Sequence, residues 1–366
     1  MPKKVRANKH IILLRFSAMG DVAMTVPVIR ALAQQYPELK ITVVSRGIFR
    51  PFFDTISPRV HFYDADFTKA HKGILGIWRL YTELRKLHVT AVADLHNVLR
   101  SKLLTFFFSS RGKNTATVDK NRAGRKQLTA KKNKVFKPLK PVIENYADVL
   151  AKLGYPVDVY SVPIPDKKRL TKDITSTTGK KEGNWIGIAP FAKHKGKVYP
   201  KSYITQVIDS LSANTKNKVF LFGGGKEEEE KLLGMAGDKN NIVVIAGKTM
   251  NLWQELKLIS HLDVMLSMDS ANGQMAAIMG SKVVTLWGAT HPYAGFVPYK
   301  QPLENSLTAD REKYPLLPTS IYGNKRVEGY EDAMKTITPQ SVVAKIEAVL
   351  DAAKKENTSK KQDIIL

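Results

Sequence analysis

The sequence predicts an α/β protein built from two doubly wound parallel-sheet domains. Its 366 residues are too many for one ordinary domain and suit two. Short apolar runs rich in β-forming residues alternate with segments of helical periodicity, which is the pattern of a parallel sheet covered by helices. This pattern restarts after a polar stretch in the middle of the chain, so each half is expected to form its own sheet.

The first half opens with a strand at 10–15, a short apolar run that reads as a buried parallel strand. A turn of small residues follows, and then a helix is predicted at 22–36. The remaining expected elements of this half are a strand at 41–45, a helix at 75–87 and a strand at 89–94.

The second half repeats the alternation after a polar, Lys- and Thr-rich linker at 163–183. Thr338 is the predicted N-cap of a last helix at 339–354. The expected domains are 1–165, 166–337 and a C-terminal helix and tail at 338–366. The expected strands of the second half are 185–190, 218–222, 242–246, 264–267 and 282–287, with helices at 201–213, 252–260 and 274–279.

The composition excludes several kinds of site and of membrane insertion. There is no cysteine, which excludes a disulfide framework, a thiolate zinc site and a cysteine nucleophile. No apolar run approaches the ~18 residues that cross a bilayer, and no signal peptide is visible. We therefore expect a cytoplasmic protein that touches a membrane only from one side.

Positive charge is concentrated in the first half. The net charge is +25, and residues 1–165 carry 29 basic against 11 acidic side chains. Between 99 and 140 there are 13 Lys and Arg, and Asp119 is the single acid. Such a surface attracts polyanions, among them anionic lipid head groups, phosphorylated glycolipid and nucleic acid. The alternative is a solvated basic surface that aids solubility.

Asp21 follows Gly20 where the first strand gives way to a helix. A carboxylate at such a loop lies near a helix N-terminus, where a general base could deprotonate an acceptor hydroxyl. The alternative is that Asp21 only caps the helix.

A lysine-rich loop at 190–200 also joins a predicted strand to a helix. Its four cations, counting His194 when protonated, could hold a diphosphate and stabilise the charge of a leaving group. The alternative is a solvated basic loop.

Two further loops follow strands of the second half. Three glycines at 223–225 allow close approach of backbone to a ligand, although they match neither a P-loop nor the dinucleotide fingerprint. Asp269, Ser270 and Asn272 crowd the other loop, where polar groups could read sugar hydroxyls and phosphate. A turn with a capping cluster would account for the same residues. The eight histidines show no metal-binding spacing.

Taken together, these segments resemble the family 9 glycosyltransferases, the lipopolysaccharide heptosyltransferase family. The resemblance spans nearly the whole chain, and the order and spacing of its segments carry more weight than any one of them. The opening 16–29 is similar to the strand, loop and helix that begin the family, and 197–200 resembles its lysine-x-tryptophan-proline step. The segments 246–249, 256–277 and 286–292 resemble its donor half.

The resemblance implies a GT-B fold, an inverting transfer without a required metal or other cofactor, and Asp21 as the base that activates the acceptor. It implies ADP-heptose as donor and an inner-core lipopolysaccharide as acceptor, at the inner face of the cytoplasmic membrane. The candidate donor contacts are Lys193, Lys197, Gly224, Asp269, Ser270 and Gln274. The candidate acceptor contacts are Ser17, Met19, Gly20, Arg100 and Lys120.

The chain departs from the family pattern in the Asp269 loop, where Ala271 replaces a glycine and Gln274 a histidine. Glutamine forms hydrogen bonds but cannot become cationic. A different nucleotide-sugar donor, or a non-catalytic protein that binds glycolipid, therefore stands as an alternative. A nucleic-acid-binding protein is disfavoured, because the aromatic residues at 106–108 form one block, as in a buried element, instead of alternating with the cations. We expect a monomer.

Overall fold

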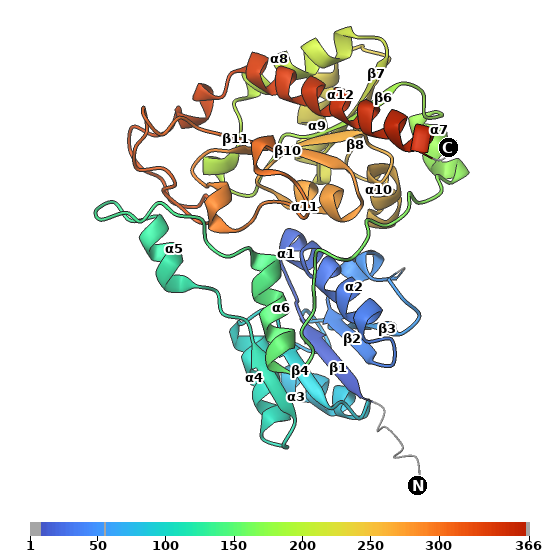
Figure 1. Cartoon of the computed structure of the whole chain (residues 1–366), viewed down its shortest axis with the longest axis vertical. Helices are drawn as coiled ribbons and strands as arrows, with labels where there is room; N and C mark the ends of the chain where they lie inside the picture. Colours follow the sequence, from blue (N-terminus) through green and yellow to red (C-terminus); the bar gives the residue numbers. More distant parts are fainter. Residues whose placement is uncertain (1–8, 55, 364–366) are drawn as a thin grey trace. The chain divides into compact units, whose positions relative to one another are not determined.

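The computed structural model describes residues 9–54 and 56–363 and contains two compact units, each built on a parallel sheet (Figure 1). Unit 1 comprises the described residues up to Arg122 together with Lys140–Pro163. Unit 2 comprises Ala123–Leu139 and the residues from Ile164 onward. The predicted α/β class with two parallel sheets is confirmed.

The sheet of unit 1 has the strand order β3-β2-β1-β4-β5, and every neighbouring pair is parallel. The central strand β1 is fully buried, as its apolar run predicts. The order reverses between β1 and β4, which makes this a doubly wound sheet with a switch point there. The strands are β1 His10–Leu14, β2 Lys40–Ser45, β3 Val60–Asp64, β4 Ala91–Asp94 and β5 Asn114–Thr117.

Helices cover both faces of this sheet. Two of them, α3 and α4, pack on the face that carries Ile12 and Leu14, while α2 and α6 contact each other on the opposite face. The helices of unit 1 are α1 Met19–Ala23, α2 Thr25–Gln35, α3 Gly73–Arg85, α4 Leu99–Ser109 and α6 Val142–Lys152, with a 3₁₀ segment at Gly47–Phe52.

The single helix predicted at 22–36 is wrong, because the chain forms two helices that break at Met24. Pro27 lies in the first turn of α2, where its missing N–H is one that the helix would leave unpaired in any case. Within a continuous helix, the proline ring would clash with the preceding turn. The break gives the loop after β1 its own short helix.

The sheet of unit 2 has the order β11-β10-β9-β6-β7-β8, again parallel throughout. The chain winds outward from β6 to β8 and then returns to the other side of β6 with β9, so the switch point lies between β6 and β9. The strands are β6 Asn184–Ala189, β7 Asn217–Phe222, β8 Ile242–Ile245, β9 Val264–Met268, β10 Lys282–Trp287 and β11 Ser306–Thr308.

One face of this sheet packs on α8, α9 and α12, while α10 and α11 contact each other and α11 packs on β9 and β10. Thr338 caps α12 as predicted, because its Oγ1 accepts the Ser341 N–H at 3.2 Å. The helix continues beyond the predicted end at 354. The helices of unit 2 are α7 Lys172–Thr178, α8 Lys201–Ala213, α9 Gly225–Ala236, α10 Leu252–Ile259, α11 Ala271–Ile278 and α12 Pro339–Asp363.

The segment Ala123–Leu139 belongs to unit 2, whereas the sequence assigned it to the first domain. Its leucine and phenylalanine side chains join a small core with Ala294 and Ile321, and the Leu139 N–H donates to the Tyr293 carbonyl at 2.8 Å. The short helix α5, Arg122–Leu128, begins this excursion. The later division, between Pro163 and Ile164, falls at the start of the predicted linker.

Among the described residues, no helix combines the length and the apolar character that a bilayer span requires.

Candidate functional site

Most of the predicted site residues lie on or next to the loops at the switch points of the two sheets, whereas Gly224 follows β7 and Lys120 follows β5. In open α/β sheets, ligands bind at the carboxyl ends of the strands where the strand order reverses. In unit 1 these positions are the loops after β1 and β4, and in unit 2 the loops after β6 and β9. Asp21 lies beyond β1, Lys197 beyond β6, and Asp269 immediately after β9.

Asp21 occupies the third position of α1, and 30% of its side chain is exposed. It is therefore not the N-cap residue; that position is taken by Ala18. The Ala18 N–H points back toward Asp21 Oδ2 at 3.4 Å. The carboxylate thus lies at a helix N-terminus, where the helix dipole favours negative charge.

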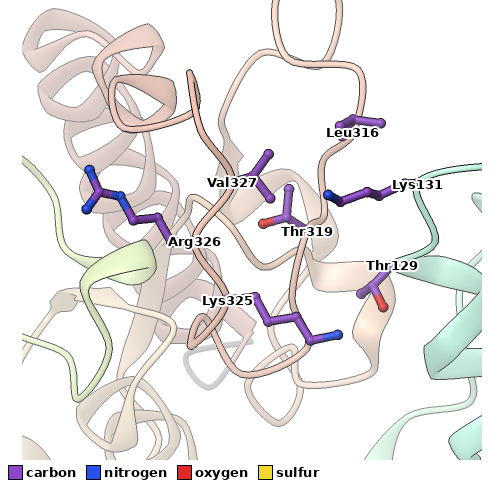
Figure 2. Close-up of a pocket in the computed structure, with 7 residues that line it drawn as sticks. All are labelled: Thr129, Lys131, Leu316, Thr319, Lys325, Arg326 and Val327. Carbon is purple, nitrogen blue, oxygen red and sulfur yellow. The ribbon is translucent and has the colours of Figure 1, made fainter.

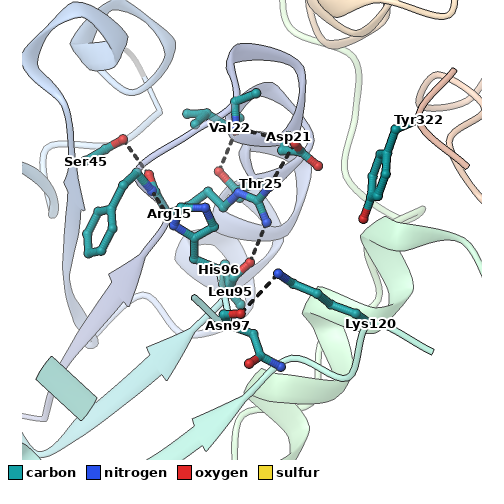
Figure 3. Close-up of polar contacts among 12 residues, drawn as sticks. Arg15, Asp21, Val22, Thr25, Ser45, Leu95, His96, Asn97, Lys120 and Tyr322 are labelled. Atoms are coloured by element: carbon teal, nitrogen blue, oxygen red, sulfur yellow. Dashed lines mark hydrogen bonds and ion pairs between the residues drawn. The ribbon is translucent and has the colours of Figure 1, made fainter. Parts of the chain in front are cut away.

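Arg15 holds this carboxylate. Its Nη2 lies 2.9 Å from Asp21 Oδ2, and its Nη1 donates to the Leu95 carbonyl at 2.8 Å (Figure 3). The guanidinium is almost fully buried and also lies 5.8 Å from the ring of Tyr146. Arg15 and the Ala18 N–H both contact Oδ2, so this oxygen is held in place. The side chain as a whole remains partly exposed.

The loop after β4 is built around the buried Asp94. Its Oδ1 accepts the N–H groups of His96 and Asn97 at 2.8 Å each, and its Oδ2 accepts the Ser101 hydroxyl at 3.0 Å. Burial raises the pKa of Asp94, and these three hydrogen bonds oppose that effect. Asp94 therefore shapes the loop that presents His96 and does not itself face solvent.

The His96 imidazole stays neutral at pH 7. Burial, and then the charges of Arg15, Lys120 and Arg100, lower its pKa to about 3. Its Nδ1 accepts the Phe16 N–H at 3.4 Å, so the proton is on Nε2.

Two of the candidate acceptor residues, Arg100 and Lys120, are cations, and the other three lie on the loop that leads into α1 and in its first turn. Lys120 donates to the Asn97 carbonyl at 3.1 Å, and Figure 3 shows its side chain directed toward that loop. Burial and then Arg15 and Arg122 lower the pKa of Lys120, while Asp21 raises it. Arg100 lies over the Phe67 ring at 5.2 Å. The structure leaves Ser17, Met19 and Gly20 half-buried on the α1 loop.

Lys197 and Asp269 bridge the two loops at the switch point of unit 2. Lys197 Nζ lies 2.7 Å from Asp269 Oδ2 and donates to the Asp269 carbonyl at 3.1 Å. Their side chains are 15% and 9% exposed. Charges withdrawn from water to this degree interact strongly and must remain paired.

Glycines from two other loops make room for the lysine. A Cβ on Gly323, whose φ is +75°, would meet the Lys197 side chain at 2.6 Å. A Cβ on Gly288 would meet the Gly196 carbonyl at 2.7 Å, and that carbonyl accepts the Ala289 N–H. The lysine is therefore held by close backbone packing on several sides.

Three buried oxygen atoms, on α11 and on the loops after β9 and β10, have no hydrogen-bond partner among the described residues: Ser270 Oγ, Gln274 Oε1 and Thr290 Oγ1. Ser270 stands at the N-cap of α11 but makes no capping bond, so the capping interpretation fails for it. Gln274 donates from Nε2 to the Phe296 carbonyl at 2.7 Å. Serine and glutamine are four residues apart and share one face of the helix. Unsatisfied buried oxygens are costly, and a polar ligand would satisfy them.

Two other predicted donor residues are arranged differently. The Gly224 N–H donates to Glu228 Oε2 at 2.6 Å, so the glycine loop is closed by its own helix α9. Lys193 is exposed beside His194, whose pKa is lowered by burial and then by Lys193 and Lys197. The loop therefore carries three cations and a neutral imidazole.

A cationic cavity of about 390 Å³ lies within unit 2 (Figure 2). Arg326 pairs with Glu331 at 3.2 Å, whereas Lys131 and Lys325 form no ion pair within the part of the chain that the structure describes. Lys131 lies in the basic stretch at 99–140. The cavity itself was not predicted from the sequence, because the two segments that line it are almost 200 positions apart in the chain. Its lining is Thr129, Lys131, Leu316, Thr319, Lys325, Arg326 and Val327.

Comparison with known proteins identifies the family. Residues 77–322 match the model of glycosyltransferase family 9 (heptosyltransferase). The chain belongs to this family. It is therefore a glycosyltransferase, and the resemblance found in the sequence is confirmed.

Curated relatives of this glycosyltransferase share about a quarter of its residues. It is 23% identical to the lipopolysaccharide core heptosyltransferase OpsX of Haemophilus influenzae over 298 residues, which cover 80% of this chain and 82% of that protein. It is 26% identical to lipopolysaccharide heptosyltransferase 3 of Escherichia coli, with 74% and 81% covered.

Solved structures share the fold. A family 9 glycosyltransferase from Veillonella parvula matches with a TM-score of 0.73 at 18% identity, covering 94% of this chain and 97% of that one. The E. coli ADP-heptose lipopolysaccharide heptosyltransferase II matches with a TM-score of 0.65 at 19% identity, covering 94% and 99%.

Several residues of the glycosyltransferase site were not assigned from sequence. Arg15 stands in the opening motif, but its role depends on the Leu95 carbonyl 80 residues later. His96 and Thr290 follow β4 and β10, and their position after a strand was the available signal. Among the described residues, no cluster of three His, Asp or Glu side chains is arranged to hold a metal ion.

The glycosyltransferase is expected to lose stability between pH 7 and pH 5. Burial and then Arg311 and Lys134 lower the pKa of His291 to about 4, and His96 is lowered further. Below an unfolded pKa of about 6.5 the unfolded chain binds protons that the native state does not, so stability falls by about 2 kcal/mol per histidine at pH 5. Chemical denaturation at both pH values would measure this loss.

His96→Gln should reduce that pH dependence, whereas the exposed His61→Gln should leave it unchanged. A pH dependence equally steep in all three proteins would contradict the assignment to the buried histidines.

Proposed function

We propose that this glycosyltransferase moves a heptose from ADP-heptose onto an inner-core lipopolysaccharide acceptor, with inversion and without a required metal ion. The observation that carries the proposal is the Lys197–Asp269 pair at the switch point of unit 2, with unsatisfied Ser270 and Gln274 oxygens beside it. The relatives named for lipopolysaccharide heptose transfer support the choice of donor and acceptor.

The proposed chemistry is a single displacement. The acceptor hydroxyl gives its proton to Asp21 as its oxygen forms a bond to the anomeric carbon. The bond from that carbon to the diphosphate oxygen breaks, and the nucleoside diphosphate leaves with the electron pair. Lys197 stabilises the negative charge that develops on the leaving group. Inversion follows because one displacement occurs and no covalent enzyme intermediate forms.

Arg15 orients Asp21 in this scheme, and Lys120 and Arg100 contribute positive charge for a phosphorylated acceptor. Ser17, Met19 and Gly20 would supply backbone and side-chain contacts beside the reacting hydroxyl. We place the enzyme at the cytoplasmic face of an anionic membrane, where such an acceptor is anchored.

The direct test is a thermal-shift screen with ADP, GDP, UDP and CMP and their sugar conjugates, followed by turnover with and without EDTA. A ligand at about 100 times its Kd stabilises the folded state by about 2.7 kcal/mol. A shift with adenine nucleotides and EDTA-resistant transfer of heptose would support the proposal. A shift with another nucleotide alone would redirect the donor, and no shift with any of them would favour a non-catalytic glycolipid-binding protein.

Ser270→Ala is expected to change stability and donor binding in opposite directions. The variant removes a buried oxygen without a partner, so the ligand-free protein should melt at the same or a higher temperature. If the donor satisfies that oxygen, its Kd should rise about tenfold, which is the worth of one hydrogen bond. Calorimetric titration with ADP measures the change. Gln274→Leu should raise the donor Kd in the same way, but it should lower the melting temperature, because it also removes the hydrogen bond from Nε2 to the Phe296 carbonyl.

Ser267→Ala is the matched control, because the Ser267 hydroxyl is buried and donates to the Met268 carbonyl at 2.9 Å. It should lower the melting temperature and leave the donor Kd unchanged. Unaltered ADP affinity in both Ser270→Ala and Gln274→Leu would remove this face of α11 from the donor site.

A further inference from the structure

The outer surfaces of α3 and α4 carry large apolar side chains in water. On α3, Ile74, Leu75 and Trp78 are 74%, 85% and 45% exposed. On α4, Leu99 and Phe106 are 83% and 62% exposed. We call these five residues the α3–α4 face. Large exposed apolar surfaces mark interaction sites.

These five side chains are not part of the hydrophobic core of unit 1. The same helices already bury Ile77, Leu80 and Leu84 from α3 and Leu104 and Phe108 from α4. The exposed residues form separate stripes, since Leu75 and Trp78 are three residues apart and Leu99 and Phe106 seven. The sequence interpretation of 106–108 as a buried block is therefore wrong for Phe106, although Phe108 is buried.

Aromatic contacts join the two helices into one surface. The Trp78 and Phe107 rings meet edge to face with centroids 5.0 Å apart, and the Phe107 and Phe106 rings are 6.1 Å apart. Figure 1 shows α3 and α4 side by side, and they pack on each other directly. The exposed Trp78 and Phe106 rings are thus connected across the two helices through Phe107, and the exposed aliphatic side chains lie on the same two helices.

Positive charge surrounds this face. Between positions 69 and 113 there are nine Lys and Arg and two acids, Glu83 and Asp94. Asp94 is fully buried, and Glu83 already binds His71 at 3.0 Å and Arg79 at 3.1 Å. All nine of these cations are exposed: Lys69, Lys72, Arg79, Arg85, Lys86, Arg100, Lys102, Arg111 and Lys113.

We propose that the α3–α4 face docks on the surface of an anionic lipid bilayer. Aliphatic and aromatic side chains enter the boundary between head groups and acyl chains, while flanking Lys and Arg side chains meet anionic head groups. A nucleic acid would use the cations and rings but would leave the exposed Ile74, Leu75 and Leu99 in water. The role of this docking rests on the proposed function, because a lipid-anchored acceptor lies at such a surface. Binding to vesicles can nevertheless be measured without any substrate.

The test is co-sedimentation of the full chain with vesicles of phosphatidylcholine containing or lacking phosphatidylglycerol. The wild type should partition onto the anionic vesicles and be released by high salt. Leu75→Ser/Phe106→Ser should reduce the partition coefficient about tenfold or more, because it removes two inserted side chains. Both residues are exposed, so the melting temperature should not fall.

The control is Leu233→Ser/Leu303→Ser, which removes two leucines of unit 2 that are 56% and 50% exposed. It should bind vesicles as the wild type does. A second readout uses Trp78 itself: in a Trp253→Phe background the other two tryptophans are fully buried, so brominated lipid should quench Trp78 emission.

Three results would overturn the proposal: no binding of the wild type to anionic vesicles, equal binding by both double variants, or no quenching of Trp78. If Leu75→Ser/Phe106→Ser instead dissociated a dimer seen in sedimentation equilibrium, the face would be an interface between copies of this chain.

Turnover on a water-soluble, delipidated acceptor separates this proposal from the proposed function. Leu75→Ser/Phe106→Ser should retain that activity and lose transfer to acceptor embedded in vesicles. Inactivity of every protein, wild type included, on the soluble acceptor would count against the proposed function and leave the vesicle-binding result unaffected.

Discussion

Asp21→Asn is expected to lower kcat about 10³-fold and to leave the fold and the donor Kd unchanged. General-base catalysis typically contributes about 10²–10⁴-fold. Asparagine has the same shape, and its amide oxygen can still accept from Arg15 and from the Ala18 N–H, which are the contacts of Asp21 in the structure. Asparagine cannot accept the proton of an acceptor hydroxyl. The substitution thus separates a structural role in α1 from a catalytic one.

Steady-state kinetics with saturating donor, together with calorimetric titration of the donor, would measure both quantities. Asp54→Asn is the matched control, since it removes one exposed carboxylate from the same unit and should keep wild-type kcat. Wild-type turnover in Asp21→Asn would show that Asp21 serves only the local structure of α1. A loss of activity accompanied by a large fall in melting temperature would also contradict the assignment.

The parts of the fold that sequence predicted are those with strong local signals. The fully buried strands β1 and β9 are short, mostly apolar runs between turn or helical segments, and their length and place in the alternation indicate strands. The strand β5, Asn-Thr-Ala-Thr, has no apolar run and forms because it pairs with β4. The excursion Ala123–Leu139 was assigned to the wrong half because Leu128 and Phe136 stand alone in a polar stretch, and only tertiary packing reveals their partners.

Site residues were predictable from the sequence where a charged side chain lies in a loop that follows a predicted strand. Asp21 follows a strand of the sheet of unit 1, and Lys197 and Asp269 follow strands of the sheet of unit 2, so topology alone brings each of them to the carboxyl edge of its own sheet. Pairing was not predictable, because the ion pair between Lys197 and Asp269 joins loops 72 residues apart. The hydrogen bond from the Gly224 N–H to Glu228 was not predictable either, because a glycine-rich sequence does not indicate which acceptor its backbone N–H groups bind.

Lys197→Met is expected to reduce both stability and turnover, for different reasons. It leaves the Asp269 carboxylate buried without its cation, and breaking a buried pair in this way costs about 3–5 kcal/mol. It also removes the charge that stabilises the departing diphosphate, for which we expect a fall in kcat/KM of about 10²–10³-fold. Denaturant unfolding and kinetics at a temperature where the variant remains folded would measure the two effects.

The double variant Lys197→Met/Asp269→Asn separates these effects, because it removes both charges and leaves none unpaired. Most of the lost stability should return, since a buried pair replaced as a whole costs little. Activity should not return, because the leaving group still lacks its cation. The Lys181–Asp263 pair of the same unit, 2.6 Å apart with side chains 26% and 27% exposed, is the control. Lys181→Met should lower stability and leave kcat/KM near the wild-type value. Recovery of full turnover in Lys197→Met/Asp269→Asn would mean that this ion pair only supports the fold, and the donor phosphates would then have to meet other cations of the 193–197 loop.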